Sequence, residues 1–515
     1  MERFEYYELK EPIDIDSLRK LISRGYTAVQ EQSVKEKQSY LDTFDFRLYN
    51  RGYFLYTNAE SYILHNSHIE KPIASLPRKR GKKHKFWWDM PDCALKEELE
   101  SSIDVRALLP LIDIEKVATP VSILNEDEKT VIRLSIEEIK TAGGGASINH
   151  VCLMPVRGYV KERNDFIRLL STLNTEKTEG NYIKAALESV GKDPKDFSSK
   201  LSISLKPDMP SSEALRIILK SLHRVIELNE PGIADDIDIE FLHDYRVAVR
   251  RTRSALGQIK GVYPDSVTKG YREKFAKLGA ITNLLRDLDI YLLHKARYRA
   301  MLPSELNPGL DHMFSIFGTR RKKAHKELVK ALKSKAYKEA MKSWGRFLSG
   351  PLDNNTAPNA QVPVIDLSAK IILKKYKQII KKGGKIDSGS PDADLHRLRI
   401  ECKKLRYMLE FFSSLYPEED IRILVKHLKK LQDNLGDFND LSVQQVSLKE
   451  FAGGLDQKND EDRETIVSSG GLISLLFQRQ KEIRSQFSEK FREFSDEETS
   501  DMFHKLFKKH KDPEL

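Results

Sequence analysis

A repeat within the chain constrains its fold more than any other feature of the sequence. The segment His243–Leu256 (HDYRVAVRRTRSAL) aligns with His396–Leu409 (HRLRIECKKLRYML) at an offset of 153 residues. The same offset continues without a gap to Asp287, which aligns with Asp440. Because chance does not maintain one offset over roughly 45 residues, this part of the chain is predicted to be a tandem duplication.

The pattern of apolar residues divides the chain into a mixed N-terminal part and a helical C-terminal part. Residues 1–200 contain short β-branched and aromatic runs, which predict an α+β domain. From residue 205 to 515 the apolar spacing is helical, which predicts two four-helix halves, 205–350 and 364–515, related by a pseudo-two-fold axis. The predicted helices are 211–229, 239–260, 268–300, 312–348, 364–382, 392–415, 420–445 and 471–507. In the N-terminal part, strands are predicted over Gly52–Ile63, Thr130–Ile139 and His150–Val156, and helices over Ser17–Leu21 and Leu95–Ile112.

The excess positive charge of the chain lies in the predicted helical part. Residues 1–200 contain 31 Lys and Arg against 32 Asp and Glu, whereas residues 201–515 have a net charge of +11. A polyanionic partner is therefore expected for the helical part alone. The three cysteines are far apart and form no metal-binding pattern, which favours a reducing cytoplasmic compartment. No apolar run approaches the length of a membrane span, so no contact with a membrane is expected.

Each copy of the repeat places a basic stripe on one predicted helix. At 100° per residue, the residues His243, Arg246, Arg250 and Arg253 lie within an arc of about 80° and extend over about 15 Å. His396, Arg399, Lys403 and Arg406 repeat this arrangement in the second copy. Beside each stripe runs an apolar one, which predicts packing of the helix against its own half. Two such helices facing each other would form a groove suited to a chain of phosphates, because arginine binds phosphate oxygens bidentately.

An alternative interpretation is that each stripe is a solvated charged face. The recurrence of the same residue types in both copies favours a shared site. The two histidines are expected either to contact phosphate or to orient a neighbouring side chain. Basic residues on the neighbouring predicted helices are further candidates for the lining of the groove, and these are Lys274, Lys277, Arg320, Arg321, His427 and Lys430.

The doubled motif, HxxRVxxRRxRxxL and HxxRIxxKKLRYxLEFF, resembles that of the CHAD family, the conserved histidine α-helical domain. The resemblance covers about residues 205–515. It implies two pseudo-symmetric four-helix bundles with a basic central cavity that binds inorganic polyphosphate, often on polyphosphate granules. The positions that match the motif are His243, Arg246, Arg250, Arg251 and Arg253 in the first copy, and His396, Arg399, Lys403, Lys404 and Arg406 in the second.

The N-terminal stretch Tyr40–Gly52 (YLDTFDFRLYNRG) resembles part of the CYTH domains, the triphosphate tunnel metalloenzymes. This resemblance implies a closed antiparallel β-barrel with an ExExK strand that binds metal and triphosphate. Here that strand reads Tyr6-Tyr7-Glu8-Leu9-Lys10, so Tyr6 replaces the first glutamate and Glu8 is only a weak metal candidate. Glu137-Glu138 is expected either to supply a carboxylate or, more simply, to face solvent.

Because metal-assisted hydrolysis needs several carboxylates, we predict a barrel without catalytic residues, bound metal or cofactor. The sequence therefore favours a polyphosphate-binding protein, located in the cytoplasm and on polyphosphate granules, that is not an enzyme. Two alternatives remain. One is an inorganic triphosphatase that uses the CYTH-like part, and the other is a nucleic-acid-binding protein, which is disfavoured because no aromatic residues interrupt the basic stripes. No oligomeric state is predicted.

Overall fold

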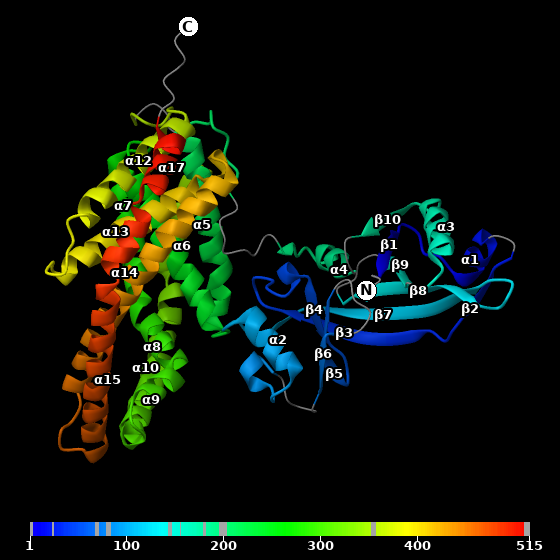
Figure 1. The fold of residues 1–515 in the computed structure, drawn as a ribbon, viewed down its shortest axis with the longest axis horizontal. Coiled ribbons are helices and arrows are strands. Elements are labelled where there is room, and N and C mark those ends of the chain that lie inside the picture. Colours follow the sequence, from blue (N-terminus) through cyan, green and yellow to red (C-terminus); the bar gives the residue numbers. More distant parts are fainter. Residues whose placement is uncertain are drawn as a thin grey trace, which may run out of the picture. The chain divides into compact units, whose positions relative to one another are not determined.

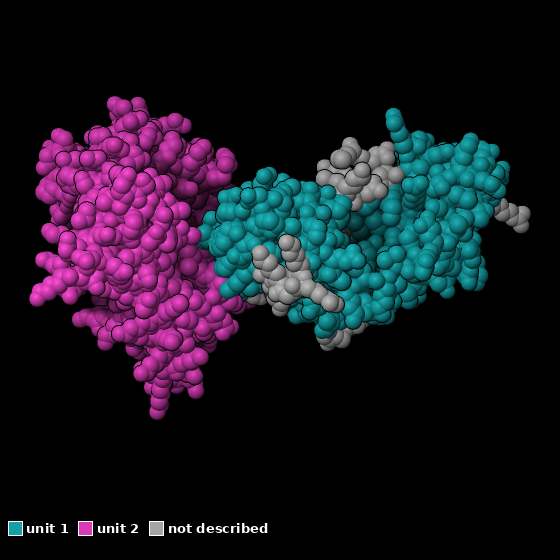
Figure 2. Space-filling view, turned by 90° about the horizontal axis from the view of Figure 1, so that it is seen from below, with its two compact units in different colours: residues 1–199 teal, residues 200–515 magenta. Residues whose placement is uncertain are grey.

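The computed structural model divides the chain into two compact units, Met1–Ser199 and Lys200–Leu515 (Figure 2). The structure describes residues 4–22, 25–66, 72–78, 84–142, 147–154, 156–178, 182–194, 203–351 and 357–508. None of the helices in these ranges combines the length and apolar composition needed to cross a bilayer.

The N-terminal unit is built on one antiparallel sheet, as expected (Figure 1). The strands follow the order β10-β1-β9-β8-β7-β3-β4-β5-β6, and β2 pairs with β7. Among the described strands, β10 and β6 therefore lie at the two ends of this order. The strands are β1 (Glu5–Leu9), β2 (Thr27–Gln30), β3 (Val34–Asp42), β4 (Tyr53–Thr57), β5 (Ser61–Asn66), β6 (Ala74–Pro77), β7 (Leu109–Leu124), β8 (Thr130–Thr141), β9 (Ile148–Met154) and β10 (Thr175–Thr178).

In the described residues of this unit, four α-helices accompany the sheet, and one of them is shorter than the sequence suggested. They are α1 (Ile15–Leu21), α2 (Ala94–Ile103), α3 (Val160–Ser171) and α4 (Ile183–Ser189). The expected helix Leu95–Ile112 ends at Ile103, because the next residue, Asp104, has a φ of +53°. Its last residues instead belong to β7, where Ile112 pairs with Tyr40 of β3.

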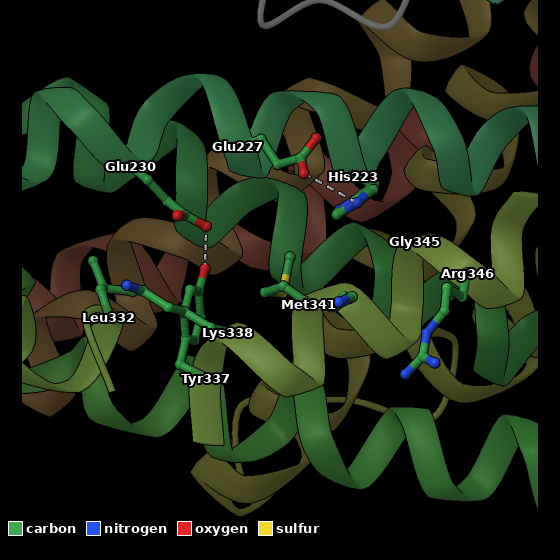
Figure 3. A pocket seen from close by; sticks show the side chains of 10 residues that line it. His223, Glu227, Glu230, Leu332, Tyr337, Lys338, Met341, Gly345 and Arg346 are labelled. Carbon is green, nitrogen blue, oxygen red and sulfur yellow. Dashed lines mark hydrogen bonds and ion pairs between the residues drawn. The ribbon is translucent and has the colours of Figure 1, made fainter. Parts of the chain in front are cut away.

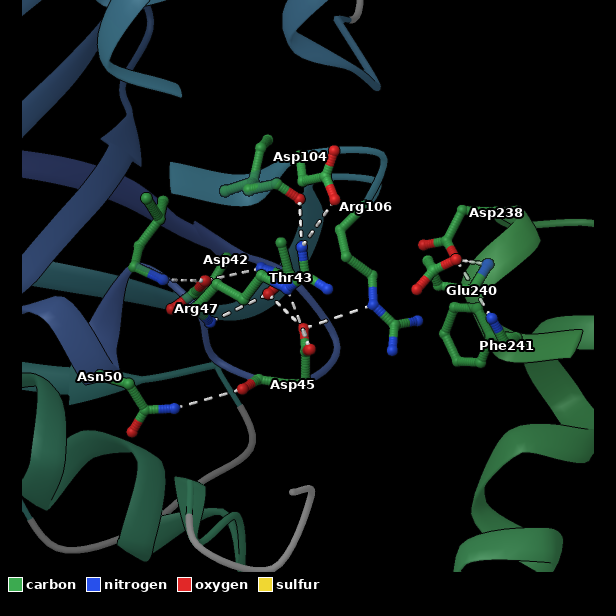
Figure 4. Close-up of polar contacts among 12 residues, drawn as sticks. Asp42, Thr43, Asp45, Arg47, Asn50, Asp104, Arg106, Asp238, Glu240 and Phe241 are labelled. Carbon is green, nitrogen blue, oxygen red and sulfur yellow. Dashed lines mark hydrogen bonds and ion pairs between the residues drawn. The ribbon is translucent and has the colours of Figure 1, made fainter. Parts of the chain in front are cut away.

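The CYTH-like stretch Tyr40–Gly52 forms a tight turn around the buried carboxylate of Asp42 (Figure 4). Asp42 accepts hydrogen bonds from the backbone N–H groups of Leu48 and Tyr49, both at 2.9 Å, and from the Tyr40 hydroxyl at 2.9 Å. Burial raises the pKa of Asp42 to about 6. These contacts fix the chain between β3 and β4.

A second carboxylate in the same turn, that of Asp45, is held by arginines. Arg47 donates to it at 3.1 Å, and Arg106 lies 3.5 Å away (Figure 4). Although burial acts in the opposite direction, these two guanidinium groups lower the pKa of Asp45. The motif that carries the CYTH resemblance therefore has a structural role here.

The C-terminal unit is helical, and its element boundaries preserve the repeat. The helices α5, α6, α7 and α10 begin 153 residues before α12, α13, α14 and α15, respectively. Within the unit α5 packs along α6 and α14 along α15 (Figure 1). The helices are α5 (Ser211–Ala234), α6 (Ile239–Gln258), α7 (Asp265–Ile281), α8 (Asn283–Leu293), α9 (Lys295–Met301), α10 (Asn307–Leu332), α11 (Lys335–Ser349), α12 (Val364–Gly383), α13 (Asp392–Phe411), α14 (Glu418–Gly453), α15 (Asp460–Ser485), α16 (Phe487–Phe494) and α17 (Glu497–Phe507).

Three predicted helices are interrupted in the structure. The segment 268–300 forms α7, α8 and α9, the segment 312–348 lies within α10 and α11, and 471–507 lies within α15, α16 and α17. Two of the new starts have capping side chains, since Ser334 and Asp496 accept hydrogen bonds from backbone N–H groups of α11 and α17. Apolar spacing continues across the breaks, which is why periodicity alone predicted unbroken helices.

The apolar stripes beside the basic residues lie in the core, as the sequence predicted. Leu242, Val249 and Leu256 of α6 are buried, and so are Leu395, Cys402 and Leu409 of α13. Burying these faces fixes the rotation of both helices. It therefore determines where the adjacent basic side chains point.

Candidate functional site: a basic cavity shared by the two copies

A cavity of about 970 Å³ lies where residues of α6 and α13 meet residues of α8, α9, α14 and α15. Seven Lys and Arg side chains line it against four Asp and Glu. The cations are Arg246, Arg250, Arg286, Arg297, Arg399, Lys403 and Arg479, accompanied by His243 and His294, and the acids are Asp287, Asp437, Asp440 and Glu450.

Both copies of the repeat contribute to this cavity. Arg246 and Arg250 come from α6, whereas Arg399 and Lys403 come from α13. A direct contact joins the two helices, because Arg250 Nε donates a hydrogen bond to the Tyr407 hydroxyl at 2.8 Å. These four cations, two from each stripe, thus line a single space.

Lys403 experiences this concentration of positive charge most strongly. Burial, followed by the charges of Arg399 and Arg250, lowers the pKa of Lys403 to about 8. Asp440, which lies opposite, offsets the effect only partly. Since Arg250 belongs to the other copy, the approach of the two stripes contributes to the lowered pKa, after burial and Arg399 of the same copy.

The arginines Arg246 and Arg399 occupy equivalent positions and have similar surroundings. Burial lowers the pKa of each guanidinium, and an aspartate at the equivalent place in each copy, Asp287 or Asp440, acts in the opposite direction. Arg399 donates to Asp440 at 3.2 Å, while its buried Nε has no hydrogen-bond partner. A buried donor without a partner is available to an anion in the cavity.

The two motif histidines have different partners. His243 Nδ1 accepts a hydrogen bond from Arg286 at 2.9 Å, which requires its proton to be on Nε2. In the second copy Asn439 replaces Arg286, and its side-chain oxygen lies 2.5 Å from His396 Nδ1. His243 lines the cavity, whereas His396 does not. The expectation that a histidine orients its neighbour therefore describes His396 best.

Four other motif residues lie outside the cavity, and three of them form ion pairs with glutamates. Arg251 contacts Glu410 at 2.5 Å, and Arg406 contacts the same carboxylate at 2.8 Å. Lys404 pairs with Glu401 at 3.0 Å. Arg253 also lies outside the cavity lining. Glu410 thus neutralises one arginine from each copy, which fastens α6 to α13.

The candidates on neighbouring helices lie outside the cavity as well. Several have partners of their own: Arg321 pairs with Asp289 at 2.8 Å, and His427 contacts the Thr499 hydroxyl at 2.8 Å. The remaining four are Lys274 over the Tyr271 ring, Arg320 over the Phe451 ring, Lys430 near Glu493, and Lys277.

Several cations that line the cavity, and one side chain that orients a motif residue, were not predicted from the sequence. Arg286, His294, Arg297 and Arg479 line the cavity from outside the aligned motif, and Tyr407 holds Arg250. Arg286 could have been recognised as a candidate, because it lies within the aligned segment, at the position that Asn439 occupies in the second copy. Of the other three, His294 and Arg297 align with Ser447 and Glu450, whereas Arg479 lies in the second copy at the position of Lys326 in the first.

In the N-terminal unit, Glu8, the weak metal candidate, lies beside two other potential ligands. Glu8, His150 and Glu137 are adjacent in register across β1, β9 and β8. Glu137 is buried and pairs with Lys116 at 2.7 Å, so the expectation that it faces solvent was wrong, whereas Glu138 pairs with Lys140 near the surface. No group of three or more potential ligands among the described residues could hold a metal ion.

The space in front of this part of the sheet is occupied by α4. Tyr182, the residue before α4, donates a hydrogen bond to Gln38 at 2.7 Å, and its ring lies 5.1 Å from the Lys116 ammonium. Burial and the charge of Lys116 lower the pKa of His150 to about 4. This histidine is therefore neutral at physiological pH.

Comparison with known proteins agrees with the duplicated motif. Residues 217–449 match the family model described as the CHAD domain. Similar solved structures include the CHAD domain from the plant Ricinus communis, with 26% identity over 57% of this chain and 95% of that chain and a TM-score of 0.48. They also include PptA from Streptomyces chartreusis, with 16% identity, coverage of 55% and 100%, and a TM-score of 0.43. No curated protein matches the chain.

The family match spans α6 and α13 and hence both copies of the motif. The helical unit of this protein therefore contains a CHAD domain.

Proposed function

We propose that the helical unit binds inorganic polyphosphate in the cavity between the two copies of the repeat, without altering it chemically. The observation that carries this proposal is that Arg246 and Arg250 of one copy and Arg399 and Lys403 of the other line a single cavity. Burial, followed by the charges of Arg399 and Arg250, lowers the pKa of Lys403 there. Such a cluster is unfavourable when empty, and a polyanion relieves the repulsion.

The composition of the lining favours phosphate groups over other anions. Arginine presents several N–H groups in one plane and grips phosphate oxygens at two points, while lysine supplies a compact charge. The aspartates Asp287 and Asp440 lie among the arginines and restrict their orientations. A row of such groups suits a chain with one negative charge on every unit.

Nucleic acid is the alternative polyanion, and the cavity suits it less well. Single-stranded nucleic acid is usually held by aromatic rings that stack on the bases. The aromatic residues that line the cavity, among those the structure describes, are Tyr291 and Tyr298, and both are buried. A chain without bases fits this lining better.

The N-terminal unit is proposed to have no triphosphatase activity. Tyr6 occupies the place of a metal ligand, and Glu137 is already engaged by Lys116. The face that would receive a triphosphate instead carries Tyr182. Binding by the helical unit would then serve to place the chain on polyphosphate, including polyphosphate granules.

The proposal is tested by measuring the affinity of the full chain for polyphosphate by titration calorimetry. The variants Arg246→Gln and Arg399→Gln remove equivalent cations and should each weaken binding about ten-fold or more, because each loses a charge-assisted hydrogen bond. The matched control is Lys370→Gln with Lys374→Gln, which removes exposed cations of α12 and should leave the affinity unchanged.

Circular dichroism of all variants verifies that they fold. If both arginine variants bind like the wild type, the cavity is not the site. Competition with single-stranded RNA and duplex DNA separates the two kinds of ligand: displacement of polyphosphate by nucleic acid at equal phosphate concentration would favour the nucleic-acid alternative.

A further inference from the structure

A second concentration of positive charge lies outside the cavity, on α10 and α11. Residues 319–349 contain eleven Lys and Arg against two Glu, a net charge of +9, whereas the whole chain has a net charge of +10. Most of these cations are exposed. The cations are Arg320, Arg321, Lys322, Lys323, Lys326, Lys330, Lys333, Lys335, Lys338, Lys342 and Arg346.

The part of this surface on α11 borders a groove against α5. Two adjoining hollows, of about 450 and 290 Å³, share Lys338 and Lys342 in their linings. Figure 3 shows the larger one. Arg346 lines the larger hollow. Since these three residues are spaced by four along the helix, they lie on one face and extend over about 12 Å.

The carboxylates of the groove are engaged by groups other than these cations. Glu227 lies 3.3 Å from His223 Nε2, and Glu230 accepts a hydrogen bond from the Tyr337 hydroxyl (Figure 3). Both glutamates come from α5. His223 also belongs to α5, so its contact keeps Glu227 on that side of the groove, whereas the Tyr337 hydroxyl donates from α11 and joins Glu230 to the helix that carries the cations.

Three cations of α11 have no acidic partner among the described residues. Lys335 is 3.9 Å from Glu339, but Lys338, Lys342 and Arg346 have no carboxylate within 4.0 Å among the residues the structure describes. Like charges four residues apart repel along a helix. The charge of the surface is thus complementary to that of a polyanion.

The second copy of the repeat differs at the positions that border this groove. Glu230 and Lys338 are replaced at the equivalent positions by Gly383 and Phe491. These two are in close contact, since a Cβ added to Gly383 would lie 2.0 Å from the Phe491 ring. An aromatic side chain therefore fills the space that is polar and open in the first copy. At these positions the open, polar lining is therefore a feature of the first copy alone.

We propose that the α5–α11 groove binds a second stretch of the phosphate chain whose other part occupies the cavity. This inference rests on the proposed function and adds a separate contact to it. Its ligand is inorganic polyphosphate, because Tyr337, the aromatic residue of the larger hollow, is buried and offers no ring for a base to stack on. A chain held at two places gains affinity through effective concentration, whereas a short chain reaches only one.

The test compares tripolyphosphate with long-chain polyphosphate on the full-length protein. The groove variant is Lys338→Glu with Lys342→Glu and Arg346→Glu. The matched control is Lys370→Glu with Lys374→Glu and Lys377→Glu, which makes the same change of charge on exposed residues of α12 that line neither hollow.

The groove variant should bind tripolyphosphate like the wild type but lose about ten-fold in affinity for long chains. The control should retain both affinities. Equal losses in the two variants would mean that net charge alone acts, and unchanged long-chain affinity in the groove variant would mean that the groove is not a contact; either result overturns the inference.

Failure of this inference is distinguishable from failure of the proposed function. If Arg399→Gln weakens tripolyphosphate binding while the groove variant has no effect, the cavity stands and the groove falls. If the groove variant instead loses affinity for duplex DNA and keeps its affinity for long-chain polyphosphate, the surface serves nucleic acid and the assignment is wrong.

Discussion

The lowered pKa of Lys403 makes polyphosphate binding depend on pH in a way that one substitution should remove. In the empty cavity burial and the neighbouring arginines lower this pKa from 10.5 to about 8. Carrying the charge there at neutral pH therefore costs about 3 kcal/mol. A bound polyanion favours the charged form and raises the pKa towards its ordinary value, so binding is coupled to protonation.

The direction of the effect follows from that coupling. Below pH 8 Lys403 is already protonated in the free protein, and its contribution to binding is fully present. Above pH 8 the free protein loses this proton while the complex retains it, so affinity falls by up to about ten-fold for each pH unit. Between pH 7 and pH 9 the wild type should lose about ten-fold in affinity.

The diagnostic variant is Lys403→Arg, because arginine keeps its charge over this whole range. Affinity is measured by calorimetry at pH 7, 8 and 9 for both proteins. Because titration of the ligand affects both affinities equally, it cancels when the affinities of the two proteins are compared at each pH. In buffers of different ionisation enthalpy at pH 8, the wild type should take up a fraction of a proton on binding and the variant less. Parallel pH profiles for the two proteins would refute the reasoning and remove Lys403 from the site.

Four further outcomes are expected. Tyr407→Phe should weaken binding several-fold with unchanged circular dichroism, because it removes a hydrogen bond of about 1 kcal/mol that orients Arg250. Affinity should fall steeply as salt is raised, by analogy with counterion release from nucleic acid, and a flat response would contradict the cavity model. Residues 200–515 expressed alone should retain the affinity of the full chain in the same titration. The full chain should release no phosphate from tripolyphosphate with Mg²⁺ or Mn²⁺, whereas release that is abolished by Glu8→Gln would establish catalysis.

The repeat allowed much of the helical unit to be predicted from the sequence. A single offset predicted which helices are equivalent, and the boundaries of α6 and α13 agree with it at both ends. The apolar stripes predicted which faces are buried, and hence that residues such as Arg246 and Arg399 point into one space. These successes share a cause, since local spacing and self-similarity are both properties of the sequence itself.

The roles of several residues could not be predicted, because they depend on contacts between segments that are far apart in the sequence. Arg251 matches the motif as well as Arg250 does, but it meets Glu410 of the other copy and is neutralised. The reverse holds for Arg479, which reaches the cavity from α15 without belonging to any motif. In the N-terminal unit the burial of Glu137 depended on Lys116 from the adjacent strand, and a pair of consecutive glutamates gives no indication of that partner.

The two copies are equivalent in sequence position but differ in their roles at the cavity. Arg250 and Arg251 of the first copy are anchored by Tyr407 and Glu410 of the second. The residues that would anchor Lys403 and Lys404 in return are Ser254 and Gly257, which lack a phenol or a carboxylate. The arginines of the first copy are therefore oriented by partners from the second copy, whereas Lys403 lacks the equivalent partners. The two sides of the proposed binding site thus differ: one presents oriented guanidinium groups, and the other an ammonium group whose pKa is lowered to about 8 and whose charge therefore depends on pH.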